Sequence, residues 1–232
     1  MAGDKFIESS YEKALIALFQ ELGYTYECGY DVERDYREPF YREVLEASLK
    51  RLNKGVSADI LAEGLKMVTN LNEGTLIQDN RRFTEMLQNG FAVPYLENGE
   101  GRTATLRLVD FEQPLANDFR IVNQWSVEEL GKIRCDMVVM INGLPLVVVE
   151  LKTASDENVT IEDAYLQIRN YMKKCPSLFG YNAFCVISDL AQSKAGTITS
   201  KFERFMEWKS EDGNYETKLI ADYATFFKGM FM

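Results

Sequence analysis

Two apolar runs joined by Asn142-Gly143 constrain the fold of this chain more than any other feature of its sequence. The runs cover 136–141 (DMVVMI) and 144–152 (LPLVVVELK), have strand length and are rich in β-branched residues. Asn-Gly favours tight hairpin turns, because both of its residues adopt positive φ at little cost. The sequence therefore predicts a β-hairpin centred on this dipeptide.

Regular spacing of apolar residues predicts that the first ninety residues are largely helical. The segments in which apolar side chains recur every three or four residues, and where we expect helices, are 6–22, 41–53, 57–70 and 74–89. Gly23 and Gly90 follow two of these segments as C-terminal caps, and Ser57 precedes another as an N-cap.

The pattern changes near Gly99, after which strand-length segments dominate. The strands expected in addition to the hairpin are 103–109, 119–125 and 183–188. Thr160 and Asp163 resemble a capping box, which predicts a helix from there to about Lys174. The segment 221–232 has the pattern of an amphipathic helix.

This order of elements predicts an α/β fold with a mixed sheet flanked by helices and preceded by a helical subdomain. We expect an N-terminal helical region at 1–100, whose first helix packs on the core, then a core at 101–220. A final segment at 221–232 looks like a helix that stops, which suggests a fragment of a longer protein.

Composition excludes several classes of enzyme. The chain has no histidine, which excludes Ser-His-Asp hydrolases and nucleases with histidine-bound metals. Its four cysteines lie far apart without a C-x-x-C pair, which argues against a disulfide framework and a zinc site. The chemistry must therefore rest on carboxylates, lysine, tyrosine or cysteine.

The net charge of −10 is unfavourable for a protein that binds nucleic acid. The charge is unevenly distributed, because 132–209 holds ten Lys or Arg and nine Asp or Glu, a net charge of +1. No apolar stretch is long enough to span a membrane, and the N-terminus lacks the apolar core of a signal peptide. We therefore expect a cytoplasmic protein with no membrane partner.

Glu150 and Lys152 lie two residues apart in the second run of the hairpin, so they project from the same face of a strand. Taken alone, E-x-K is common and fits a solvated strand edge with a surface ion pair. Asp136, at the start of the first run, adds a second carboxylate. Carboxylates, water and a phosphate are typical Mg²⁺ ligands, and Lys152 would stabilise charge that develops on the phosphate.

The geometry of the turn decides whether Asp136 and Glu150 share a face. With the Asn-Gly dipeptide alone as a regular turn, the two carboxylates would face opposite sides of the sheet. We therefore expect an odd loop or a bulge, for example a loop over 141–143 with Gly143 in the left-handed conformation. In that example Asp136 pairs with Val148, and Glu150 lies diagonally on the same face.

Gln167 and Tyr171 lie four residues apart on the helix expected after the hairpin, so they share one helical face. The apolar residues that would anchor this helix on the sheet are Ile161, Ala164, Ile168 and Met172. From spacing alone, an active-site role and the polar rim of a packed helix remain equally open.

Several of these motifs resemble segments of the N-terminal nuclease domain of type I restriction endonuclease R subunits, which is of the PD-(D/E)xK class. The matching segments, in the order of that family, are DFEQPLANDF, RCDMVVMINGLPLVVVELK, IEDAYLQIRNYM, PSLFGYN and RFMEWK. The resemblance is close within 105–209 and loose within 41–90.

The resemblance implies a PD-(D/E)xK fold, a restriction-endonuclease-like mixed sheet, with Mg²⁺ as cofactor and Mn²⁺ as a substitute. The catalytic residues that it implies are Asp136, Glu150, Lys152, Gln167 and Tyr171. The metal ligands that it implies are Asp136, Glu150 and the backbone carbonyl of Leu151, with Glu8 of the acidic first helix as a further candidate.

The resemblance also implies partners: double-stranded DNA, the methyltransferase and specificity subunits of a restriction complex, and C-terminal motor domains of the same chain. No G-x-x-x-x-G-K-S/T phosphate loop occurs in the sequence, so ATP is expected only in the missing motor domains. Two alternatives stay open. One is another PD-(D/E)xK nuclease of repair or transposition, and the other is a catalytically silent domain that binds DNA or partner domains.

Overall fold

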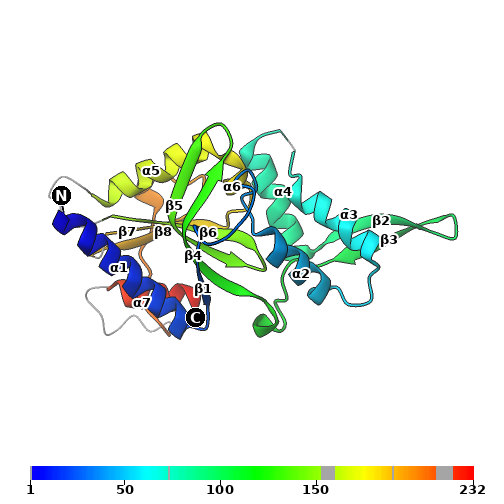
Figure 1. Cartoon of the computed structure of the whole chain (residues 1–232), viewed down its shortest axis with the longest axis horizontal. Coiled ribbons are helices and arrows are strands. Elements are labelled where there is room, and N and C mark those ends of the chain that lie inside the picture. Colours follow the sequence, from blue (N-terminus) through cyan, green and yellow to red (C-terminus); the bar gives the residue numbers. More distant parts are fainter. Residues whose placement is uncertain (1, 73, 153–159, 190, 213–221) are drawn as a thin grey trace.

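The chain folds around a six-stranded mixed sheet (Figure 1). The computed structural model describes residues 2–72, 74–152, 160–189, 191–212 and 222–232, with side chains from Ser10 onward. In spatial order the strands are β1 (Thr25–Cys28), β4 (Phe119–Glu128), β5 (Lys132–Ile141), β6 (Leu144–Leu151), β7 (Phe184–Ser188) and β8 (Ser193–Gly196). The pairs β1–β4 and β6–β7 are parallel, and the other pairs are antiparallel.

Helices cover both faces of this sheet, as Figure 1 shows. One face packs against α1 (Ala2–Glu21) and α7 (Tyr223–Phe231), and the other against α5 (Ile161–Lys174) and α6 (Pro176–Gly180). Side chains that alternate along β6 separate the two cores, since Val147 and Val149 belong to the first and Val148 to the second. The sheet is therefore buried on both sides.

The remaining elements form a helical region with its own hairpin. They are α2 (Arg42–Leu52), α3 (Ala58–Thr69), α4 (Leu76–Asn89), β2 (Phe91–Glu97) and β3 (Glu100–Leu106), with short 3₁₀ turns at Pro114–Ala116 and Phe202–Arg204. The β2–β3 hairpin extends away from the six-stranded sheet (Figure 1).

The helix signals in the sequence are confirmed. Ser57 caps α3 by accepting a hydrogen bond from the backbone N–H of Ile60, and Gly90 ends α4 with a φ of 72°. Thr160 and Asp163 form the expected capping box of α5. The residues predicted to anchor α5 on the sheet, Ile161, Ala164, Ile168 and Met172, are all buried.

Among the described residues, the structure contains three strands that the sequence did not predict: β1, β2 and β8. β1 has four residues, and its pairing partner in β4 lies far along the chain, so local periodicity carries little signal for it. β2 contains Pro94, which cannot donate to a strand ladder and weakens a strand prediction. The mixed α/β architecture is nevertheless confirmed.

Among the described helices, none is both long and apolar enough to cross a membrane.

Candidate active site

The β5–β6 hairpin turns through Asn142 and Gly143, with φ angles of 54° and 81°. The ladder shifts by one residue beyond the turn, because Met140 pairs with Pro145 and Val139 pairs with Val147. The skipped residue on β6 is a bulge. A bulge was predicted because both carboxylates must face the same side of the sheet, and the structure confirms it. The left-handed conformation of Gly143 is also confirmed.

The details of the expected loop were wrong, because the turn has two residues and Val148 pairs with Val138 instead of Asp136. Packing explains the difference. A side chain at Gly143 would meet the backbone of α2 at 2.6 Å, and the Gly143 carbonyl accepts the N–H of Tyr41. The tight turn therefore fits closely beneath α2, and the extra residue is accommodated within the strand.

This register brings Asp136 and Glu150 together. The last regular pair is Met137 with Val149, so the next position of the ladder sets Asp136 opposite Glu150. The backbone N–H of Leu151 donates to Oδ2 of Asp136 at 2.9 Å. The two carboxylates predicted from the sequence therefore meet where β5 and β6 part.

Glu150 is a fully buried acid at this point of the sheet, with a relative exposure of 0%. Its Oε1 accepts a hydrogen bond from Nζ of Lys152 at 2.8 Å, whereas Oε2 has no donor among the described residues. Burial raises the pKa of the Glu150 carboxyl well above its ordinary value. The charge of Asp136 raises this pKa further, and the Lys152 ammonium lowers it.

A chain of hydrogen bonds runs from Glu150 across to helix α5. Lys152 Nζ donates to Oε1 of Gln167 at 2.8 Å, and Nε2 of Gln167 donates to the hydroxyl of Tyr171 at 2.6 Å. The Tyr171 hydroxyl donates to the backbone carbonyl of Arg134 at 2.8 Å. The structure thus joins Lys152, Gln167 and Tyr171 in one network that returns to β5.

Helix α1 contributes a carboxylate on the β4 side of this network. Glu12 accepts hydrogen bonds from the side chains of Asn123 and Gln124. Glu8 belongs to the same helix, but its side chain lies outside the described residues.

Two residues near the site were not predicted from the sequence. Gln124 has a φ of 53° and lies opposite Asp136. The β4–β5 ladder is interrupted at this position, although the residues on either side are paired. Glutamine has no special preference for this conformation, so the sequence carries no signal for it. Arg134 holds the end of the network through its backbone carbonyl, a group that every residue has.

The donor set fits a divalent cation bound by oxygen. Two carboxylates converge, and a buried oxygen of Glu150 lacks a donor, which is costly unless a cation or a proton occupies the position. Within the part of the chain that the structure describes, no cluster of three or more acidic, cysteine or histidine residues adds to them. The remaining ligands of such a cation would be backbone oxygen, water or substrate.

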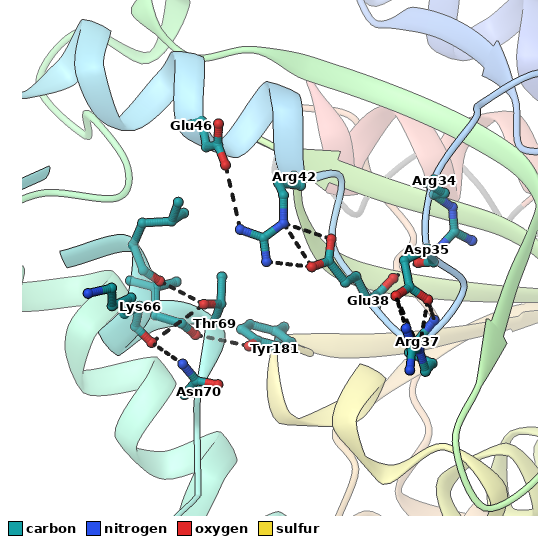
Figure 2. Close-up of polar contacts among 12 residues, drawn as sticks. Arg34, Asp35, Arg37, Glu38, Arg42, Glu46, Lys66, Thr69, Asn70 and Tyr181 are labelled. Carbon is teal, nitrogen blue, oxygen red and sulfur yellow. Dashed lines mark hydrogen bonds and ion pairs between the residues drawn. The ribbon is translucent and has the colours of Figure 1, made fainter. Parts of the chain in front are cut away.

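A cavity of about 640 Å³ lies elsewhere, between α3, α6 and the segment before α2. Figure 2 shows polar contacts of several residues that line it. Its cationic side chains are already paired: Arg37 bonds Asp35, Arg42 bonds Glu38 and Glu46, and Lys66 bonds Glu63. The Tyr181 hydroxyl at its wall donates to a backbone carbonyl of α3. None of the predicted site residues lines this cavity.

Comparisons with known proteins show which family the chain resembles. The family model "type I restriction enzyme R protein N terminus" matches residues 5–204. Over 219 residues the chain is 32% identical to a putative type I restriction enzyme MjaIXP endonuclease subunit of Methanocaldococcus jannaschii, covering 90% of this chain and 21% of that protein. Over 226 residues it is 32% identical to the type I restriction enzyme HindI endonuclease subunit of Haemophilus influenzae, covering 93% and 21%.

A third relative, the type I restriction enzyme SauMW2ORF169P endonuclease subunit of Staphylococcus aureus, is 37% identical over 125 residues, covering 53% of this chain and 13% of that protein. The chain spans about a fifth of the length of the first two relatives. Because the family model covers most of its residues, the chain belongs to the family of type I restriction enzyme R protein N-terminal domains.

Proposed function

We propose that this chain is the nuclease domain of a type I restriction R subunit and hydrolyses phosphodiester bonds of double-stranded DNA in a metal-dependent reaction. One observation carries the proposal. Asp136, Glu150 and Lys152 converge where the end of β6 parts from β5, within a network that includes Gln167 and Tyr171. A solvated strand edge would leave Glu150 exposed, whereas its side chain is fully buried.

We propose Mg²⁺ as the metal, with Mn²⁺ as a substitute, held by Asp136, Glu150 and the backbone carbonyl of Leu151. A strand residue directs its N–H and C=O to the same side, and the Leu151 N–H points to Asp136, so its carbonyl lies on that side too. Glu8 is a further candidate ligand on α1. When bound, the metal would polarise the phosphate and lower the pKa of the attacking water.

Lys152 would stabilise the negative charge that develops on the phosphate during hydrolysis. Its side chain is 17% exposed, and its ammonium is held between Glu150 and Gln167, so it needs little rearrangement when a phosphate approaches. A donor positioned in advance in a poorly hydrated site stabilises a transition state more than a mobile surface lysine does.

Gln167 and Tyr171 are proposed as positioning residues for Lys152. The Tyr171 hydroxyl donates a hydrogen bond to the Arg134 carbonyl, so its oxygen accepts the hydrogen bond from the Gln167 amide N–H. The amide oxygen of Gln167 is then directed at Lys152. Tyr171 thereby determines which end of the Gln167 amide faces the ammonium.

The wider assignments rest on the family. We propose the methyltransferase and specificity subunits as partners, and C-terminal motor domains of the same chain as the place where ATP is bound and DNA is translocated. Residues 1–100 would form the helical region, 101–220 the nuclease core and 221–232 the start of the connection to the motor. We propose that this activity is cytoplasmic.

The test uses the intact R subunit assembled with its partners. Lys152→Ala is expected to abolish DNA cleavage while ATP hydrolysis continues, because the substituted residue lies outside the motor. Lys173→Ala, at an exposed lysine of α5, is the matched control and should cut normally. Normal cleavage by Lys152→Ala would overturn the proposal. If variants of Asp136, Glu150 and Lys152 all still cleaved DNA, a catalytically silent binding domain would be favoured.

A further inference from the structure

Arg134 lies on β5 beside the candidate active site. Arg134 precedes Asp136 by two residues on β5, beyond the last β5–β6 pair of Met137 and Val149. Its neighbours on the strand pack in the core on the α5 side, so its side chain points to the face on which α1 lies. The Arg134 carbonyl accepts the hydroxyl of Tyr171, so the network that positions Lys152 also holds the backbone of β5 at this residue. The guanidinium is therefore carried by backbone that is fixed relative to the catalytic residues.

The guanidinium of Arg134 is exposed and available for a ligand. One of its N–H groups donates to the hydroxyl of Tyr30 at 2.6 Å, and its Cζ lies 6.0 Å from the centre of that ring. The ion pairs of the described residues include no carboxylate partner for Arg134, whereas Arg37 and Arg120 are each paired. A guanidinium has five N–H donors, and most of those on Arg134 have no partner among the residues that the structure describes.

A DNA phosphate needs such a cation at this site. The carboxylates of Asp136 and Glu150 repel a phosphate before a metal is bound, and the Lys152 ammonium is already paired with Glu150 at 2.8 Å. The chain as a whole carries a net charge of −10, so it offers little general attraction for DNA. An arginine two residues from Asp136, with no ion pair among the described residues, supplies local attraction, and its planar fork suits the oxygens of a phosphate.

We propose that Arg134 binds a phosphate of the DNA backbone next to the phosphodiester that is cut, with the Tyr30 hydroxyl orienting its guanidinium. The inference rests on the proposed function, because it takes DNA as the ligand. Arg134 is two strand positions from Asp136, which corresponds to about 7 Å along the strand. A DNA strand that reaches the metal site where β5 and β6 part would then contact Arg134 as well.

The test measures binding of a short DNA duplex of fixed sequence to this chain in chelator, so that no strand is cut, over a series of low salt concentrations. Arg134→Ala is expected to weaken binding several-fold and to reduce the slope of log affinity against log salt by about 1, because one phosphate contact is lost. Arg134→Lys keeps the charge and should keep the slope. Arg134→Gln, which keeps a long polar side chain, should behave like Arg134→Ala.

The matched control is Arg102→Ala, because Arg102 is an exposed arginine on the distant β2–β3 hairpin and lies near Glu97 and Glu100. This variant should bind the duplex with the slope of the unsubstituted chain. An unchanged salt slope in both Arg134→Ala and Arg134→Gln overturns the inference. Failure of the unsubstituted chain to bind the duplex at low salt also overturns it. Neither result decides the proposed function, which Lys152→Ala tests through cleavage.

Discussion

The ammonium of Lys152 lies 2.8 Å from Oε1 of Glu150, and this contact satisfies only one of the two carboxylate oxygens. The other oxygen, Oε2, is buried without a donor among the described residues. A buried polar atom left unpaired costs about 1–3 kcal/mol. The site is therefore built at some expense to the metal-free fold, which makes stability a direct readout of the metal.

Replacing Glu150 by glutamine should leave the metal-free chain as stable as before or more stable, by up to about 2 kcal/mol. The amide has the same shape, keeps an oxygen for Lys152 and places an N–H donor toward Asp136, while the buried charge is removed. Thermal unfolding followed by circular dichroism in chelator at neutral pH measures the difference.

The same experiment with added Mg²⁺ should raise the melting temperature of the unsubstituted chain and have no such effect on Glu150→Gln, because a ligand stabilises only the state that binds it. Glu128→Gln, at an exposed acid at the end of β4, is the control and should respond to Mg²⁺ like the parent. An equal rise in Glu150→Gln would show that the ion binds elsewhere.

Gln167→Ala and Tyr171→Phe should each reduce cleavage by the intact enzyme by about 10–100-fold, because residues that orient a catalytic group have effects of this size. Without the Tyr171 hydroxyl, the Gln167 amide loses the partner that directs its oxygen at Lys152. The Mg²⁺-induced rise in melting temperature should persist in both variants, because neither residue is proposed to bind the metal.

Leu166→Ala is the control for these helix variants, since Leu166 is 55% exposed on α5 and should be neutral. If both Gln167→Ala and Tyr171→Phe cut DNA at the parent rate, the two residues are only part of the packed helix. Loss of the Mg²⁺ response in either variant would instead assign that residue to the metal site.

Gly143→Ala should destabilise the fold more than Gly99→Ala, although both glycines follow an asparagine in a two-residue turn. Both have positive φ, 81° and 82°, which costs an alanine about 1–2 kcal/mol. A Cβ at Gly99 would meet nothing within 4 Å, whereas at Gly143 it would meet the backbone of Tyr41 and Leu45 at 2.6 Å. The clash should add about 1–3 kcal/mol, measured by urea unfolding.

Equal losses in the two glycine variants would mean that the catalytic hairpin is not packed against α2 as described. A cleavage assay adds a second readout. Gly143→Ala should also reduce cleavage, because moving the turn disturbs the register that sets Asp136 opposite Glu150. Gly99→Ala, on the distant hairpin, should cut normally.

The sequence by itself determined the features that depend on neighbours along the chain. Caps at Ser57 and Thr160 and the turn at Asn142-Gly143 act within a few residues, through side-chain hydrogen bonds and positive φ. The need for a bulge also followed from the sequence, because side chains alternate along a strand and both carboxylates must face one side.

Tertiary structure decided where that bulge lies and what surrounds the carboxylates. The tight fit of Gly143 beneath α2 moved the extra residue into β6, and the contact of Lys152 with Gln167 depends on how α5 packs on the sheet. The short strand β1 exists because β4 lies beside it, and the left-handed Gln124 lies where that sheet breaks its ladder. Such contacts join residues distant in sequence, so no local pattern encodes them.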